Sequence, residues 1–151
     1  MTTTDLEIRE ATDADADALA PLFEVLGYAT SPLVLRERLA GLRRVDPTGK
    51  VLAAFDGNGR ALGFLTLHHT PVLHRPTAVG RITALAVDAA AQGRGVGRQL
   101  VDAAERACRA AGLARIEVTS GLTHVPAYDF YRRLGYADHG LRFAKVLSPG
   151  D

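Results

Sequence analysis

The feature that most limits the fold of this chain is a glycine-rich loop, Gln92–Gly97, that stands between two segments of predicted regular structure. The apolar run before the loop, Val79–Val87, predicts a strand. After the loop, apolar residues recur at helical spacing up to Gly112, and Arg115–Thr119 predicts another strand. Two strands of one sheet that are joined through a helix normally run parallel, with a right-handed crossover. The sequence therefore predicts an α/β fold with a parallel strand pair beside the loop.

The rest of the chain predicts short strands and helices, without a repeat or a linker. Strands are expected at 6–9, 50–55, 61–68 and 141–147, and helices at 12–26, 32–42 and 127–134. The run from Asp56 to Gly59 predicts a hairpin turn, and Pro21 is expected to kink or interrupt the first helix. This order predicts a single α/β domain over residues 5–148, with a mixed, largely antiparallel sheet flanked by helices.

Charge and composition narrow the classes of partner. The net charge is only +1, so neither nucleic acid nor a membrane surface is an expected partner. The chain has no run of about 18 apolar residues and does not begin like a signal peptide, so we expect a cytoplasmic protein. The single cysteine, Cys108, fits a reducing compartment, and its helical spacing among alanines predicts burial. The five histidines show no metal-ligand spacing, so no metal site is expected.

The composition of the loop suits an anionic ligand. Glycines let several backbone N–H groups converge on one anion, and the dipole of the following helix attracts negative charge. Arg94 and Arg98 add two full positive charges, which together favour a pyrophosphate. A phosphate-binding P-loop is excluded because no Gly-Lys-Ser/Thr follows. A dinucleotide fingerprint is disfavoured: Glu117 lies about 20 residues beyond Gly97, but the third glycine is missing at positions 98 and 100. A glycine-rich turn without a ligand is the remaining alternative.

Two segments resemble motifs of the GNAT superfamily of N-acetyltransferases. Gln92–Gly97, directly after the Val79–Val87 strand, is similar to the acetyl-CoA motif of that family: Gln or Arg, two residues, Gly, one residue, then Gly or Ala. The segment from Ala127 to Tyr136 resembles the family pattern Ala-x-x-Phe-Tyr-x-x-x-Gly-Phe. The predicted order of elements also follows the family. The resemblance implies a central parallel strand pair that splays apart at the site for acetyl-CoA.

The resemblance also implies roles for individual residues. Acetyl-CoA would be the co-substrate, and a primary amine of a small molecule or peptide would attack it directly through a tetrahedral intermediate. The N–H of Val87 would stabilise the oxyanion, and Tyr131 would protonate the departing CoA thiolate, since a phenol with a pKa of about 10 is protonated at neutral pH. The residues expected to bind acetyl-CoA are Leu85, Ala86, Val87, Gln92, Gly93, Arg94, Gly95, Val96, Gly97 and Arg98.

The residue that acts as general base does not follow from the resemblance. Many family members carry a glutamate where this chain has Thr83, and a threonine cannot take the proton that a protonated amine must lose. The candidates are Glu117, His68, His69, His124 and a chain of water molecules. We favour Glu117 on sequence grounds, with a role as a cross-strand charge partner as its alternative.

The acceptor site is expected opposite the cofactor, with Tyr28, His68 and His69 as substrate-binding residues. This lining is not acidic, so a polycationic acceptor is not favoured. A homodimer is compatible with the sequence. Two other classes of function stay open: a module that senses acyl-CoA without turning it over, against which the presence of Tyr131 argues, and an oxidoreductase, which the glycine spacing disfavours.

Overall fold

The computed structural model describes residues 6–119, 125–140 and 142–150. The chain divides into two compact units, residues 1–118 and 119–151, and each is described here by itself. The strands of the first unit are β1 (Glu7–Glu10), β2 (Lys50–Phe55), β3 (Ala61–Thr70), β4 (Val79–Val87) and β5 (Ile116–Val118). Its α-helices are α1 (Ala16–Leu26), α2 (Pro32–Val45) and α3 (Val96–Ala110), with short 3₁₀ turns at Asp13–Asp15 and Ala89–Ala91.

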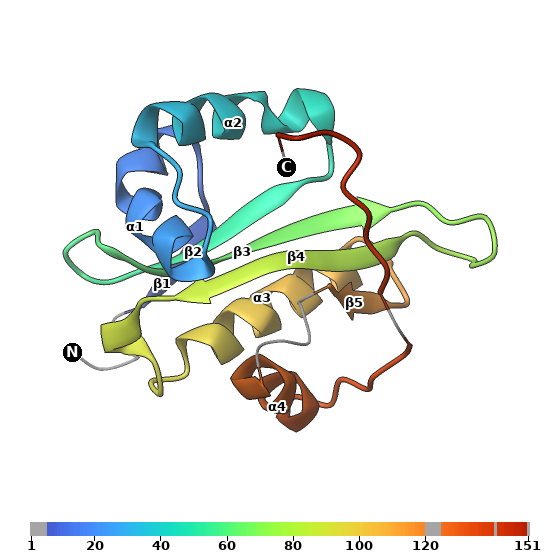
Figure 1. The fold of residues 1–151 in the computed structure, drawn as a ribbon. Coiled ribbons are helices and arrows are strands. Elements are labelled where there is room, and N and C mark those ends of the chain that lie inside the picture. The colour runs from blue at the N-terminus through green and yellow to red at the C-terminus, as the bar shows by residue number, and fades with distance from the viewer. Residues whose placement is uncertain (1–5, 120–124, 141, 151) are drawn as a thin grey trace. The chain divides into compact units, whose positions relative to one another are not determined.

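The five strands form one mixed sheet in the order β1-β2-β3-β4-β5 (Figure 1). The first four strands pair antiparallel, and β4 pairs parallel with β5. Helix α3 connects the parallel pair. The predicted α/β class and the parallel pair beside the glycine-rich loop are therefore confirmed.

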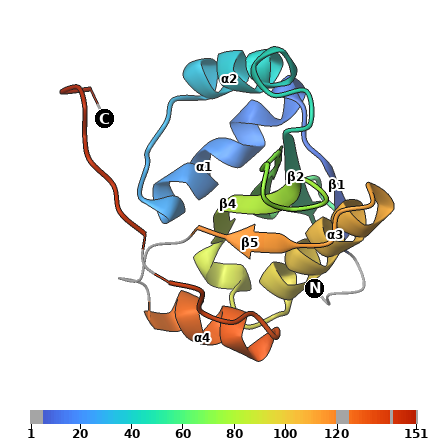
Figure 2. The ribbon, with the colours of Figure 1, turned by 90° about the vertical axis from the view of Figure 1, so that its right-hand side faces the viewer.

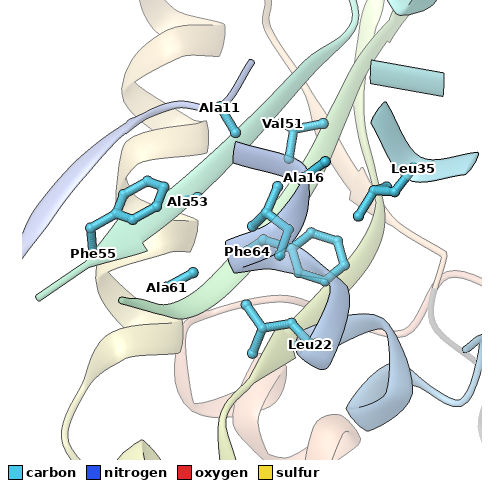
Figure 3. Packing of buried hydrophobic residues seen from close by; sticks show 11 residues of the cluster. Ala11, Ala16, Leu22, Leu35, Val51, Ala53, Phe55, Ala61 and Phe64 are labelled. Atoms are coloured by element: carbon cyan, nitrogen blue, oxygen red, sulfur yellow. The ribbon is translucent and has the colours of Figure 1, made fainter. Parts of the chain in front are cut away.

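Helices α1 and α2 cover one face of the sheet, and α3 covers the other (Figure 2). On the first face, Leu19 and Leu22 of α1 are buried with Phe64 of β3, and the Phe23 ring stacks on Phe64 with ring centroids 4.6 Å apart. Figure 3 shows how small side chains, such as Ala16, let the helix approach the strands closely. Burial of apolar surface on this face fixes α1 against β3 and β4.

The second face is packed by α3. A Cβ atom on Gly63 of β3 would lie 3.1 Å from side-chain atoms of Val96 and Leu100, so glycine permits the close approach of helix and sheet. Cys108 of α3 is buried, as its spacing predicted, and burial raises the pKa of its thiol.

Two local predictions differ from the structure. Helix α1 continues through Pro21 without interruption, and both Pro21 and Asp17, whose carbonyl loses its helical partner, lie on the exposed face of the helix. The predicted strand at 141–147 is wrong over its described part: residues 142–147 form no strand, and Phe143 is 88% exposed. The apolar side chains there suit a sheet, but a strand forms only beside a pairing partner, and the described residues provide none.

The second unit contains helix α4 (Val125–Arg133). The helix ends at Gly135, whose φ of 93° is the left-handed conformation that glycine adopts most readily. The N–H of Tyr136 donates to the carbonyl of Tyr131 at 3.0 Å across this cap.

Candidate active site

A β-bulge in β4 sets the geometry of the candidate site. Thr66 of β3 lies opposite Ala84, whereas the next residue, Leu67, lies opposite Ile82. Thr83 is therefore an extra residue in β4, and two residues of β4 oppose one of β3 at this point. A bulge changes which residues of the strand direct their backbone groups towards each neighbouring strand.

Beyond the bulge, the backbone of β4 has an open edge. The N–H of Asp88 donates to the carbonyl of Leu62 at 2.8 Å, on the β3 side. Because backbone groups alternate along a strand, the N–H groups of Val87 and Leu85 point away from β3. The parallel partner β5 ends at Val118, so no strand among the described residues pairs with this side of β4. The edge is thus free to bind an extended ligand through backbone hydrogen bonds.

The glycine-rich loop follows this edge directly. Gly93 and Gly95 adopt positive φ angles of 82° and 80°, which glycine alone tolerates easily. Gln92 closes the loop onto the strand, because its side-chain Nε2 donates to the carbonyl of Val87 at 3.3 Å. Helix α3 begins at Val96, so its unpaired N–H groups face the loop, as the sequence predicted.

The charges at this helix terminus favour an anion. The first turn of α3 contains no acidic residue, and no side chain caps its N-terminus. Arg94 and Arg98 are exposed, and no ion pair joins either one to another residue that the structure describes. Two cations beside a helix N-terminus are repelled by the positive end of the helix dipole, and a bound anion relieves this repulsion. The loop therefore fits the pyrophosphate of a nucleotide-bearing ligand.

A group of polar side chains lies on the sheet face that α1 and α2 cover. The hydroxyls of Thr66 and Thr83 are hydrogen-bonded at 2.6 Å. Glu117 lies opposite Arg81 in the β4–β5 register and accepts from its Nη2 at 3.2 Å, and from Nε of Arg115 at 2.8 Å. The hydrogen bond from Arg115, followed by that from Arg81, lowers the pKa of the Glu117 carboxyl. A carboxylate held between two guanidinium groups is a weak proton acceptor, and this geometry favours the charge-partner role of Glu117.

His68 of β3 is on the same face and pairs with Asp46, the residue that follows α2. The distance from Nδ1 of His68 to Oδ2 of Asp46 is 2.7 Å, and both side chains are partly buried. The hydrogen bond from His68, together with those from Thr48, lowers the pKa of Asp46. Sequence reasoning missed Asp46, because it is 22 residues from His68 in the chain and carries no motif.

The other residues predicted to bind the acceptor or to act as base do not all lie on this face of the sheet. His69 points to the opposite face of β3, because its register partner is Gly80, where a Cβ atom would clash with Sγ of Cys108. Its Nε2 is buried, with no hydrogen-bond partner among the described residues. Tyr28, in the connection between α1 and α2, is 72% exposed. His124 lies outside the described residues.

Tyr131 belongs to α4 in the second unit. Its side chain is buried, with edge-to-face contacts to Phe130 and Tyr136 at centroid distances of 5.1 and 5.7 Å. Burial raises the pKa of Tyr131 to about 12. The neighbouring Phe130 is less buried than Tyr131. The phenol is thus a proton donor over the whole physiological pH range.

Two further properties concern the described part of the chain as a whole. It contains no group of three or more His, Cys, Asp or Glu side chains arranged to hold a metal ion. In these same residues, every helix is too short or too polar to cross a membrane.

Comparison with known proteins places these features in a family. Residues 12–136 match the family described as the Acetyltransferase (GNAT) family. An aminoalkylphosphonate N-acetyltransferase from Salmonella typhimurium is 32% identical over 142 residues, which are 93% of this chain and 91% of that protein. A mycothiol acetyltransferase from Pseudarthrobacter chlorophenolicus is 36% identical over 94 residues, which are 60% of this chain but only 28% of that protein. The crystal structure of an acetyltransferase from Trypanosoma brucei superposes with a TM-score of 0.79 at 26% identity, covering 95% of this chain and 100% of that one.

Proposed function

The chain belongs to the GNAT family of acetyltransferases, and from that premise we propose that it transfers an acetyl group from acetyl-CoA to the amine of a small aminoalkylphosphonate. It is an acyltransferase of the N-acetyltransferase type, and its family uses acetyl-CoA as co-substrate. The observation that carries the proposal is the edge of β4 at Leu85–Val87, which pairs with no strand among the described residues and leads directly into the glycine-rich loop before α3.

Two observations support an aminoalkylphosphonate as the acceptor: the similarity to a relative of that name and the net charge of one group of side chains. The relative from Salmonella typhimurium is similar over nearly its whole length. In this chain, Arg81 and Arg115 share one carboxylate, that of Glu117, so the group carries a net positive charge. A phosphonate dianion suits such a group, whereas a polycation does not.

The residues of this chain have the following roles in the proposed reaction. The loop from Gln92 to Arg98 binds the pyrophosphate, and the backbone of Leu85–Val87 binds the pantetheine arm. The neutral amine attacks the thioester carbonyl carbon, and the N–H of Val87 stabilises the resulting oxyanion. The carbon–sulfur bond then breaks, Tyr131 protonates the CoA thiolate, and the amide nitrogen returns a proton to Tyr131. The products are the N-acetylated amine and free CoA.

Release of free thiol from acetyl-CoA tests this function directly. We expect 2-aminoethylphosphonate to be acetylated with a kcat/KM about 10-fold or more above that of ethylamine, its matched control without the phosphonate, because one charged hydrogen bond contributes about 1.5–3 kcal/mol. Equal values for the two amines would contradict the phosphonate assignment.

The alternative function is an acyl-CoA sensor. It predicts CoA binding in calorimetry without thiol release for 2-aminoethylphosphonate, ethylamine, spermidine or a peptide with a free N-terminus. Localisation in the cytoplasm and formation of a homodimer stay predictions from the sequence.

A further inference from the structure

The turn after α2 holds one carboxylate in a fixed position. Oδ1 of Asp46 accepts two hydrogen bonds from Thr48, from its N–H at 3.0 Å and from its hydroxyl at 2.7 Å. Gly49 lets the turn close on the carboxylate, because a Cβ atom there would lie 3.0 Å from Oδ2 of Asp46. The N–H of His69 donates to the Thr48 hydroxyl at 3.3 Å, which ties the turn to β3. Because these contacts occupy Oδ1 of Asp46 and fix the turn, Oδ2 is directed at His68.

That partner is the imidazole of His68. Its Nδ1 lies 2.7 Å from Oδ2 of Asp46, and an ionised carboxylate only accepts hydrogen bonds, so the proton of the neutral ring is on Nδ1. The lone pair of Nε2 is then available as a proton acceptor. No hydrogen bond joins Nε2 to another described residue, and Nε2 is not among the buried polar atoms without a partner. A histidine with an oriented ring and a free Nε2 has the arrangement of a general base.

The position of His68 suits a proton acceptor for an amine at the candidate active site. His68 follows Thr66 on the same face of β3, about 7 Å further along the strand. Thr66 in turn is hydrogen-bonded to Thr83 in the bulge of β4, beside the open edge. Two residues on one face of a strand are separated by a distance that a bridging water molecule can cross. Thr66 therefore lies between His68 and Thr83, the position at which the family resemblance places a glutamate.

The other charged groups that face His68 leave Asp46 as its only close ionic partner among the described residues. Arg81 of β4 is its register partner, but the guanidinium of Arg81 is directed at Glu117 of β5. Arg115, which precedes β5, also binds Glu117. The carboxylate of Asp46 therefore fixes the orientation of the His68 ring through Nδ1.

We propose that His68 is the general base that deprotonates the acceptor ammonium, and that Asp46 is the positioning residue that orients its imidazole. This proposal rests on the proposed acetyl transfer. The acceptor ammonium gives one proton to Nε2 of His68, which passes it to solvent, and the neutral amine then attacks the thioester carbonyl carbon. The second proton of the nitrogen ends on the thiol of CoA, so the overall reaction releases one proton.

The test is the pH dependence of kcat/KM for His68→Gln and Asp46→Asn, with His139→Gln as the matched control at an exposed histidine. The amine is the best acceptor among 2-aminoethylphosphonate, ethylamine, spermidine and a peptide with a free N-terminus. We expect His68→Gln to lower kcat/KM roughly 10²–10⁴-fold at pH 7. The loss should shrink above pH 9, where the amine is partly neutral without a base. Asp46→Asn should cause a smaller loss of kcat/KM, because the ring of His68 remains but loses the carboxylate that orients it.

Further measurements separate this role from a structural one. CoA affinity by calorimetry should be unchanged in both variants, and added imidazole should restore part of the activity of His68→Ala, which a purely structural histidine would not allow. Wild-type activity and an unchanged acidic limb in His68→Gln would overturn the assignment of His68 while leaving acetyl transfer intact. An absence of transfer by the wild-type protein to every amine of the panel would overturn the proposed function and the base together.

Discussion

Tyr131 shows how strongly a single side chain depends on its surroundings. A free phenol has a pKa of about 10, but burial between aromatic rings raises the pKa of Tyr131 to about 12. The group therefore stays a proton donor as the pH rises and loses its proton only near pH 12. A basic limb in the activity profile below pH 10 would have to come from another group.

Replacing Tyr131 with phenylalanine tests its proposed role as general acid. The ring and its packing are retained, so we expect kcat to fall roughly 10²–10⁴-fold while CoA affinity stays within a factor of about two. Tyr128→Phe is the matched control, since Tyr128 is an exposed tyrosine on the same helix. Full turnover by Tyr131→Phe would reduce Tyr131 to a packing residue.

At the scale of elements, sequence reasoning succeeded where the signal is local. The turn after β2 forms as predicted, because Oδ1 of Asp56 accepts from the N–H groups of Asn58 and Arg60 within the same short run. The glycine loop and α3 follow from neighbouring residues in the same way. The pair of Asp46 and His68 could not be predicted, because it depends on how the turn after α2 meets β3.

The C-terminal segment shows how a local sequence signal can mislead. Residues 142–147 are rich in apolar side chains, but composition reports only which side chains suit a sheet and not whether a partner strand is present. Pairing is a tertiary property, as is the bulge at Thr83 that opens the edge of β4. The glycine-rich loop and the start of α3 were therefore predictable as local structure, whereas the geometry of the acceptor side was not.

The glycine loop is the element whose disruption should affect binding most directly. Gly95→Val places a β-branched residue at a φ of 80°, which is strained for any side chain that branches at Cβ, and it adds bulk where the pyrophosphate approaches. We expect CoA affinity to fall at least about 10-fold in calorimetry, with the fold retained because the loop is exposed. Gly95→Asn is the companion variant, because asparagine tolerates a positive φ and therefore adds a side chain with less backbone strain. If both variants bind CoA like the wild type, the anion-binding role of the loop is wrong.

The molecule as a whole is held in part by carboxylates that bridge separate elements. Asp15 in the turn before α1 binds Arg9 of β1, Asp46 after α2 binds His68 of β3, and Glu117 of β5 binds Arg81 of β4. The pKa values of all three carboxyl groups are lowered by these partners. A carboxyl whose pKa is lower in the folded state stabilises the fold above its unfolded pKa, and that contribution is lost as the pH falls through the folded value.

The free energy of unfolding should therefore fall as the pH drops below the ordinary carboxyl values of 3.8 and 4.5. Each partly exposed pair contributes up to about 1 kcal/mol, so the three together account for up to about 3 kcal/mol. Glu117→Gln removes one carboxylate and leaves two guanidinium groups without their shared partner. We expect this variant to be about 1 kcal/mol less stable than the wild type in urea at pH 7. The difference should narrow as the pH falls below 4.5, where the unfolded wild-type chain binds a proton at Glu117, and should be lost below the lowered pKa of Glu117 in the folded state. Glu37→Gln is the control, because Glu37 is exposed on α2 and forms no ion pair with another described residue. Its free energy of unfolding should match that of the wild type both at pH 7 and below pH 4.5. A stability difference for Glu117→Gln that stays constant from pH 7 down to pH 2.5 would show that its ion pairs do not contribute to the fold.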